Sequence, residues 1–234
     1  MELTPRLEAV AAFVDAGSTV ADIGTDHALL PIALIQRGRC RHAILTDIRR
    51  GPLETARENV RAAGLLPMAE FYLTDGIKEI LPLHPDCYII AGMGGETIAG
   101  ILSVELTRYL SGVKLILQPM TKQRELREFL TTNGFHINTE VLAREKERIY
   151  TIMCCCFDGK GEEYTELELT CGRPELEMSD STAADYLEGV KRQLERQYFG
   201  RRLAHTDTDA DRQLLEALGK HIEQLKAALK NENN

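Results

Sequence analysis

The segment Val20-Ala-Asp-Ile-Gly-Thr-Asp-His-Ala28 has the pattern of a strand, a tight turn and the start of a helix. An apolar run ends at Asp22, one glycine follows, and another apolar segment begins directly afterwards. In an open α/β sheet, this is the place where a nucleotide-like cofactor binds. The next apolar run also ends in an acid, Asp47, which lies 25 residues beyond Asp22. Because such an acid can accept hydrogen bonds from both hydroxyls of a ribose, the two features indicate an adenosine-type cofactor.

Short apolar runs alternate with helical patterns along the first two thirds of the chain. The runs predict strands at residues 19–23, 43–46, 69–74, 87–91 and 114–118. Two further runs, 135–142 and 148–156, follow without a helix between them and predict an antiparallel hairpin. Five parallel strands closed by a hairpin are typical of class I methyltransferases, whereas a nicotinamide-binding sheet usually adds a sixth crossover. The pattern therefore predicts a Rossmann-like, doubly wound α/β sheet and favours S-adenosylmethionine over NAD.

The glycine spacing supports the same choice of cofactor. A dinucleotide loop would need glycine at positions 24, 26 and 28, but only Gly24 is present, with Asp26 and Ala28 at the other two. A carboxylate at Asp26 would repel a pyrophosphate and would tolerate a cationic sulfonium. The alternative is that Asp26 only caps the helix that the pattern predicts from residue 26 to residue 37.

The composition changes after the predicted hairpin. Residues 158–180 contain eight acidic and two basic residues and predict a connector with little structure of its own. Residues 181–234 carry two apolar stripes at helical spacing, which predict an antiparallel, coiled-coil-like pair of helices. We therefore expect a cofactor-binding domain at 1–157, the acidic connector at 158–180 and a helical hairpin domain at 181–234.

Composition and charge narrow the class of protein. No apolar run approaches a membrane span and no leader pattern stands at Met1, so we expect a cytoplasmic protein without a membrane partner. The six cysteines have no metal-ligand spacing, which predicts reduced thiols and no metal. The net charge of −8 disfavours nucleic acid at face value, but basic clusters occur around residues 122–127, 144–148 and 191–202. No obligatory protein partner is evident.

Three motifs carry a specific resemblance. Ala21-Asp-Ile-Gly-Thr-Asp-His-Ala-Leu-Leu-Pro31, Ala91-Gly-Met-Gly-Gly95 and Leu115-Ile-Leu-Gln-Pro119, preceded by Thr4-Pro-Arg-Leu7, resemble the bacterial tRNA methyltransferases that modify N1 of adenine 22. The resemblance implies a class I methyltransferase fold with a helical C-terminal domain, S-adenosylmethionine as the donor and tRNA as the acceptor. This family commonly has an aromatic residue after the first motif, where Leu29 stands here.

The chemistry of the residues, together with this resemblance, gives candidate site residues. Asp26 is the candidate catalytic residue, because it could orient the adenine through its amine or stabilise the developing positive charge. The expected cofactor-binding residues are Arg6, Asp22, Gly24, Asp26, His27, Asp47, Ile48, Asp75, Gly76, Ala91, Gly92, Met93 and Gly94. The expected substrate-binding residues are Met93, Gln118, Pro119, Met120, Lys122, Arg144 and Arg196.

Other function classes remain open from the residues alone. One alternative is a methyltransferase acting on a small molecule, which would need no basic surface outside its cleft. The other is a non-catalytic α/β protein that binds a cofactor and interacts with other proteins. A nicotinamide oxidoreductase would need glycine at position 26 or 28, and neither is glycine.

Overall fold

The computed structural model describes residues 2–103, 109–173, 182–204 and 208–232. Internal contacts divide the chain into two compact units, Met1–Glu163 and Tyr164–Asn234. Residues 174–180 of the expected connector and residues 205–207 of the expected interhelical turn lie outside the described residues.

The first unit is built on one seven-stranded sheet with the strand order β3-β2-β1-β4-β5-β7-β6. The first five strands are parallel, and β7 runs antiparallel to both of its neighbours. The predicted Rossmann-like sheet and its closing hairpin are therefore confirmed. The strands are β1 (Ser18–Ile23), β2 (Cys40–Asp47), β3 (Ala69–Leu73), β4 (Cys87–Gly94), β5 (Lys114–Thr121), β6 (Phe135–Glu145) and β7 (Arg148–Phe157).

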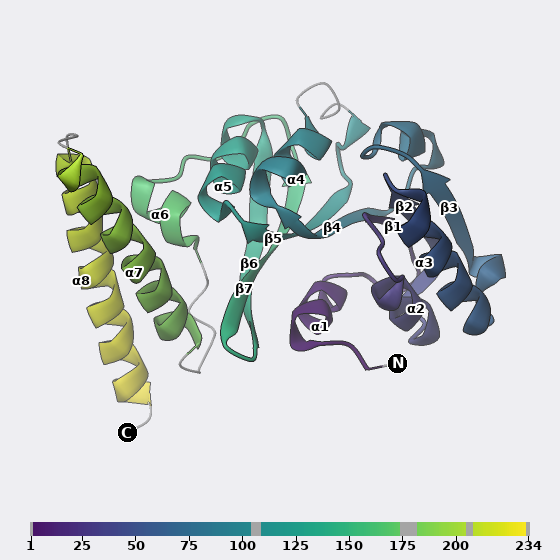
Figure 1. The fold of residues 1–234 in the computed structure, drawn as a ribbon, viewed down its shortest axis with the longest axis horizontal. Helices are drawn as coiled ribbons and strands as arrows, with labels where there is room; N and C mark the ends of the chain where they lie inside the picture. The colour runs from purple at the N-terminus through teal and green to yellow at the C-terminus, as the bar shows by residue number, and fades with distance from the viewer. Residues whose placement is uncertain (1, 104–108, 174–181, 205–207, 233–234) are drawn as a thin grey trace. The chain divides into compact units, whose positions relative to one another are not determined.

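Helices cover both faces of the sheet. Figure 1 shows α1 and α2 on one side and α4 and α5 on the other. Thr4 caps α1 by accepting a hydrogen bond from the Leu7 amide, and proline occupies its first helical position. The helical segments of this unit are α1 (Pro5–Ala12), α2 (Leu29–Gln36), α3 (Arg50–Ala62), η1 (Leu66–Met68), η2 (Lys78–Leu83), α4 (Gly95–Leu102) and α5 (Gln123–Thr132).

Three boundaries differ from the sequence prediction in ways that matter for the site. Helix α2 begins at Leu29 instead of residue 26, because Ala28 adopts a left-handed conformation with φ 55° and interrupts the helix. Strands β4 and β5 continue three residues further than predicted, because Met93 pairs with Pro119 and Gly94 pairs with Thr121 across irregular register.

A fully buried ion pair joins α5 to the hairpin. The Arg127 guanidinium donates to both carboxylate oxygens of Glu140 on β6, and the two side chains are 0% and 2% exposed. Fully buried apolar side chains lie on the same elements, with Leu130 on α5, Phe135 on β6 and Met153 on β7, where it pairs with Glu140. A charge in such surroundings is tolerable only while its partner stays in place.

The second unit contains α6 (Glu166–Cys171), α7 (Thr182–Leu203) and α8 (Asp209–Glu232). Ion pairs join Glu188 to Lys226 near one end and Arg201 to Asp211 near the other, so α7 and α8 run antiparallel as predicted. Their buried faces come from the two predicted apolar stripes, with Leu187 and Leu194 on α7 and Leu218, Ile222 and Leu225 on α8.

Part of the expected connector is helical. Thr165 and Glu168 form a capping box that starts α6. The prediction of little regular structure in residues 158–180 is therefore wrong for α6, because the acidic composition hid this local start pattern. The boundaries of the domains predicted from sequence stay a prediction.

All six cysteines are free thiols, and five of them are buried; the exception is the half-buried Cys156. Burial raises the pKa of the Cys87 thiol to about 12 and that of Cys155 well above its usual range. Among the described residues, no helix has both the length and the apolar character needed to cross a bilayer.

We predict that Glu140→Gln lowers the free energy of unfolding by about 3–5 kcal/mol, because it removes the negative charge of Glu140 that faces the buried Arg127 guanidinium. Urea denaturation measures the change. Glu128→Gln is the matched control, since it breaks the exposed pair with Arg124 and should cost at most about 1 kcal/mol. A loss below about 1 kcal/mol for Glu140→Gln would contradict the assigned role of the buried pair.

Candidate functional site

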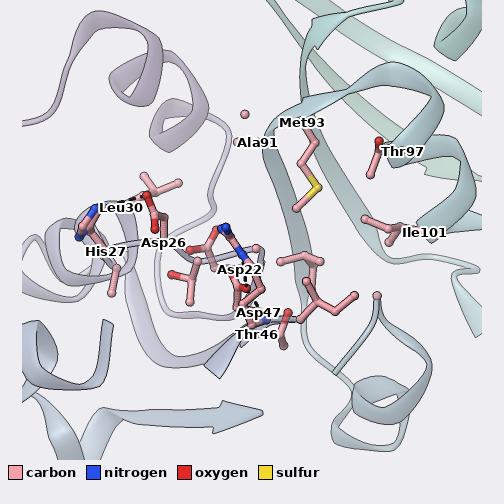
Figure 2. A pocket seen from close by; sticks show the side chains of 18 of the residues that line it. Asp22, Asp26, His27, Leu30, Thr46, Asp47, Ala91, Met93, Thr97 and Ile101 are labelled. Carbon is pink, nitrogen blue, oxygen red and sulfur yellow. Dashed lines mark hydrogen bonds and ion pairs between the residues drawn. The ribbon is translucent and has the colours of Figure 1, made fainter. Parts of the chain in front are cut away.

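A cavity of about 670 Å³ opens at the carboxyl ends of β1, β2 and β4. Twelve of the thirteen predicted cofactor-binding residues line it, and Gly94 does not. Figure 2 shows Asp22, Asp26 and Asp47 on one side of this cavity, with Met93, Thr97 and Ile101 on the other. The structure thus brings together residues that the sequence separates by as much as 95 positions, from Arg6 to Ile101.

The loop after β1 is fixed by backbone contacts. The Gly24 and Thr25 amides both donate to the Thr46 carbonyl at 2.8 Å, and the Asn59 side-chain amide donates to the His27 carbonyl at 3.0 Å. Gly24 has a φ of +77°, and a Cβ added there would collide with the terminal methyl group of Met93. The backbone conformation therefore favours glycine at position 24, and a side chain there would also require the flexible Met93 side chain to move.

Four carboxylates face the cavity, from Asp22, Asp26, Asp47 and Asp75. Asp22 is buried, and this burial raises its pKa to about 6. Asp47 is also buried, and its Oδ1 accepts a hydrogen bond from the Arg49 amide at 2.7 Å, which orients the carboxylate. Among the described residues of the lining, Arg6 and Arg49 are the only guanidinium groups beside four carboxylates, so the cavity favours a cation over a diphosphate.

Asp26 does not cap α2. The residue at the N-terminal cap is Ala28, and its side chain makes no capping hydrogen bond. The Asp26 carboxylate is 65% exposed at the cavity rim and lies 3.3 Å from the His27 imidazole. The capping alternative is therefore wrong, and the Asp26 carboxylate is available to a ligand.

Three threonine hydroxyls were missed by the sequence analysis. Thr25, Thr46 and Thr74 line the cavity. The buried hydroxyls of Thr46 and Thr74 have no hydrogen-bond partner among the described residues, whereas a hydrogen bond from Thr25 to Asp22 partly offsets the rise in the pKa of that acid. Buried polar groups normally have partners, so such atoms around one cavity indicate a polar ligand. Thr46 and Thr74 each precede a predicted acid, Asp47 and Asp75, and this adjacency could have identified them.

The predicted substrate-binding residues are less closely grouped. Met93 lines the cavity, but Gln118, Pro119, Met120, Lys122 and Arg144 do not. Gln118 is fully buried, and Lys122 pairs with Glu125 at 2.7 Å and with Glu96 at 3.8 Å. Arg196 belongs to the second unit, on α7. The described residues contain no group of three histidine, cysteine or acidic side chains arranged to hold a metal ion.

Comparison with known proteins agrees with this geometry. A family model described as a methyltransferase domain matches residues 3–153. The tRNA (adenine(22)-N(1))-methyltransferase of Bacillus subtilis (strain 168) is 31% identical over 172 residues, which cover 74% of this chain and 72% of that protein.

Two solved structures extend the similarity to the whole chain. Streptococcus pneumoniae Sp1610 in complex with S-adenosyl-L-methionine is 29% identical, with a TM-score of 0.80 over 93% of this chain and 99% of that one. M. capricolum TrmK in complex with the cofactor product S-adenosyl-homocysteine is 25% identical, with a TM-score of 0.72 over 98% of this chain and 99% of that one.

The raised pKa of Asp22 predicts how stability depends on pH. An acid whose folded pKa lies above its unfolded value contributes stability that is complete below pH 3.8 and is lost as pH rises through about 6. We therefore expect Asp22→Asn, compared with the wild type, to gain up to about 3 kcal/mol in relative stability between pH 4 and pH 7.5. Urea unfolding of both proteins across this range measures the difference, and parallel stability curves would refute it.

Proposed function

The chain belongs to the tRNA (adenine(22)-N(1))-methyltransferase family, and we propose that it transfers a methyl group from S-adenosylmethionine to N1 of adenine 22 in tRNA. The observation that carries this proposal is the cavity at the carboxyl edge of the sheet, where four carboxylates surround space for a cationic, adenosine-containing ligand. Modification of tRNA would take place in the cytoplasm.

The chain's residues fit this donor. S-adenosylmethionine, when bound, supplies an electrophilic methyl group on a cationic sulfur. Asp47 is oriented to accept from the ribose hydroxyls, and Asp75 can accept from the adenine amine. Ile48 is 62% exposed beside the cavity and provides an apolar contact next to the ribose. Arg6 can bind the carboxylate of the amino-acid end. The unpartnered threonine hydroxyls supply further hydrogen bonds to a polar ligand.

The reaction needs alignment more than it needs a base. Adenine N1 carries its own lone pair, so catalysis consists of holding that nitrogen in line with the methyl carbon and the sulfur. We assign Asp26 to the adenine, where its exposed carboxylate orients the exocyclic amine and stabilises the positive charge of the methylated base. Met93, on the opposite wall, packs against the base. Because N1 lies on the pairing edge, the adenine must be unpaired or turned out of the stack.

The tRNA backbone would meet basic side chains outside the cavity. Lys122, Arg144 and Arg196 remain candidate phosphate contacts. Arg127, in the basic cluster at 122–127, is excluded as a phosphate contact, because its guanidinium is fully buried against Glu140. Phosphate contacts make binding fall steeply with salt, so a flat salt dependence of tRNA affinity would exclude this part of the proposal.

The alternatives receive less support. A small-molecule acceptor is disfavoured by the relative that acts, by its name, on tRNA. A purely binding protein is disfavoured by the methyltransferase family model, which matches residues 3–153.

We predict methyl transfer from labelled S-adenosylmethionine to an unmodified tRNA transcript and none to a transcript with guanine at position 22. Nuclease mapping of the labelled product locates the methyl group. Asp26→Asn should lower kcat by about 10²-fold, because it removes the charge that faces the adenine. The exposed Glu79→Gln, which lies outside the cavity lining, should retain full activity. Equal labelling of both transcripts would exclude adenine 22 as the acceptor. Full activity of Asp26→Asn would exclude a catalytic role for Asp26.

We also predict that Gly24→Ala impairs donor binding while Gly17→Ala does not. Both glycines have a φ of +77°, so both substitutions introduce the same backbone strain, about 1–3 kcal/mol by denaturation. Only Gly24→Ala displaces the Met93 methyl group, which lines the cavity, since nothing lies within 4 Å of a Cβ at Gly17. Calorimetry with S-adenosylmethionine separates the two variants, and equal affinities would contradict the packing of Met93 on Gly24.

A further inference from the structure

We propose that Gln118 is a positioning residue that holds the Arg6 guanidinium ready for the carboxylate of the methyl donor. This inference rests on the proposed function, because it assigns a ligand group to Arg6. It gives Gln118 a role different from the contact with a substrate base that its sequence position suggested.

Every polar group of the Gln118 amide is used inside the protein. Its Oε1 accepts from Arg6 Nη1 at 2.7 Å and from the Gly92 amide at 3.2 Å. Its Nε2 donates to the Pro119 carbonyl at 2.9 Å and lies 3.7 Å from Met120 Sδ. An amide has two donor hydrogens and one oxygen with two lone pairs, so no capacity remains for a nucleic-acid base. The side chain is also 0% exposed, which separates it from any substrate.

The bridge connects three distant parts of the first unit. Arg6 comes from α1, Gln118 from β5, and Gly92 from the end of β4, where its φ of +81° turns the backbone at the cavity. Arg6 and Gly92 line the cavity themselves, and Gln118 joins them from behind. The Arg6 guanidinium also lies over the Tyr150 ring of β7, 5.6 Å from its centroid. The guanidinium is therefore held by contacts from two strands.

Because the Gln118 side chain is neutral, it can orient the Arg6 guanidinium without competing with an anionic group of the ligand. An Arg–carboxylate pair inside the protein would satisfy the guanidinium charge and compete with an anionic ligand group. The Gln118 amide fixes the guanidinium through one of its five N–H groups and leaves the positive charge uncompensated. In a cavity lined by four carboxylates, this oriented charge provides a place for the donor's carboxylate.

The test compares two ligands that differ only in that carboxylate. Gln118→Met keeps the side-chain length and removes the acceptor for Arg6. We expect it to weaken S-adenosylmethionine binding about tenfold in calorimetry and to change the binding of decarboxylated S-adenosylmethionine by less than about twofold. In an Arg6→Met background, Gln118→Met should add little further loss, because both substitutions remove the same contact.

The possible outcomes separate the inference from the proposed function. Unchanged affinity for S-adenosylmethionine, or equal losses for both ligands, would overturn the role of Gln118 while leaving the methyltransferase proposal intact. Absence of binding by the wild type would overturn the proposed function and the inference with it. If Gln118→Met does not fold, Gln118→Asn takes its place, because the side chain shorter by one methylene moves the amide away from Arg6. Its affinities for S-adenosylmethionine and for decarboxylated S-adenosylmethionine are then compared in the same way.

Discussion

Parallel pairing of β1 with both β2 and β4 is the constraint on which the rest of the structure depends. At this point the strand order changes direction, so the connections after β1 and β4 lead to helices on opposite faces and a crevice opens between them. The acids at the ends of β1 and β2 then meet the glycine-rich end of β4. These acids and glycines are far apart in the sequence, so they come together only because β1 pairs with both β2 and β4.

Electrostatics follow from this arrangement. Asp22 is held where its charge is poorly solvated, and this burial raises the pKa of its carboxyl because ionisation is unfavourable there. Among the described residues, the buried Thr46 and Thr74 hydroxyls likewise have no hydrogen-bond partner. The cavity therefore concentrates polar groups that are poorly satisfied by the protein and better satisfied by a cationic, hydroxyl-bearing ligand. This is the expected character of a binding site, where local stability is reduced so that a ligand can be held.

The sequence predicted the parts of the site that depend on local pattern. Acids at the ends of strands and the Gly24 turn were correctly located because strand periodicity places such residues at one edge of the sheet. The left-handed Ala28 and the extension of β4 to Gly94 escaped prediction. The extension depends on pairing with Thr121, which is distant in sequence. The role that we infer for Gln118 was hidden for the same reason, because its partners Arg6 and Gly92 come from other elements.

The run of cysteines on β7 has a chemical consequence. Cys154 and Cys155 lie in a strand hydrogen-bonded on both sides, and their burial keeps the thiols protonated at neutral pH. Because alkylation and disulfide exchange proceed through the thiolate, we expect Cys154 and Cys155 to react slowly in the native protein. Separation of β7 from β5 and β6 would expose these thiols to solvent. The rate at which an alkylating reagent labels them therefore reports how often this edge of the sheet opens.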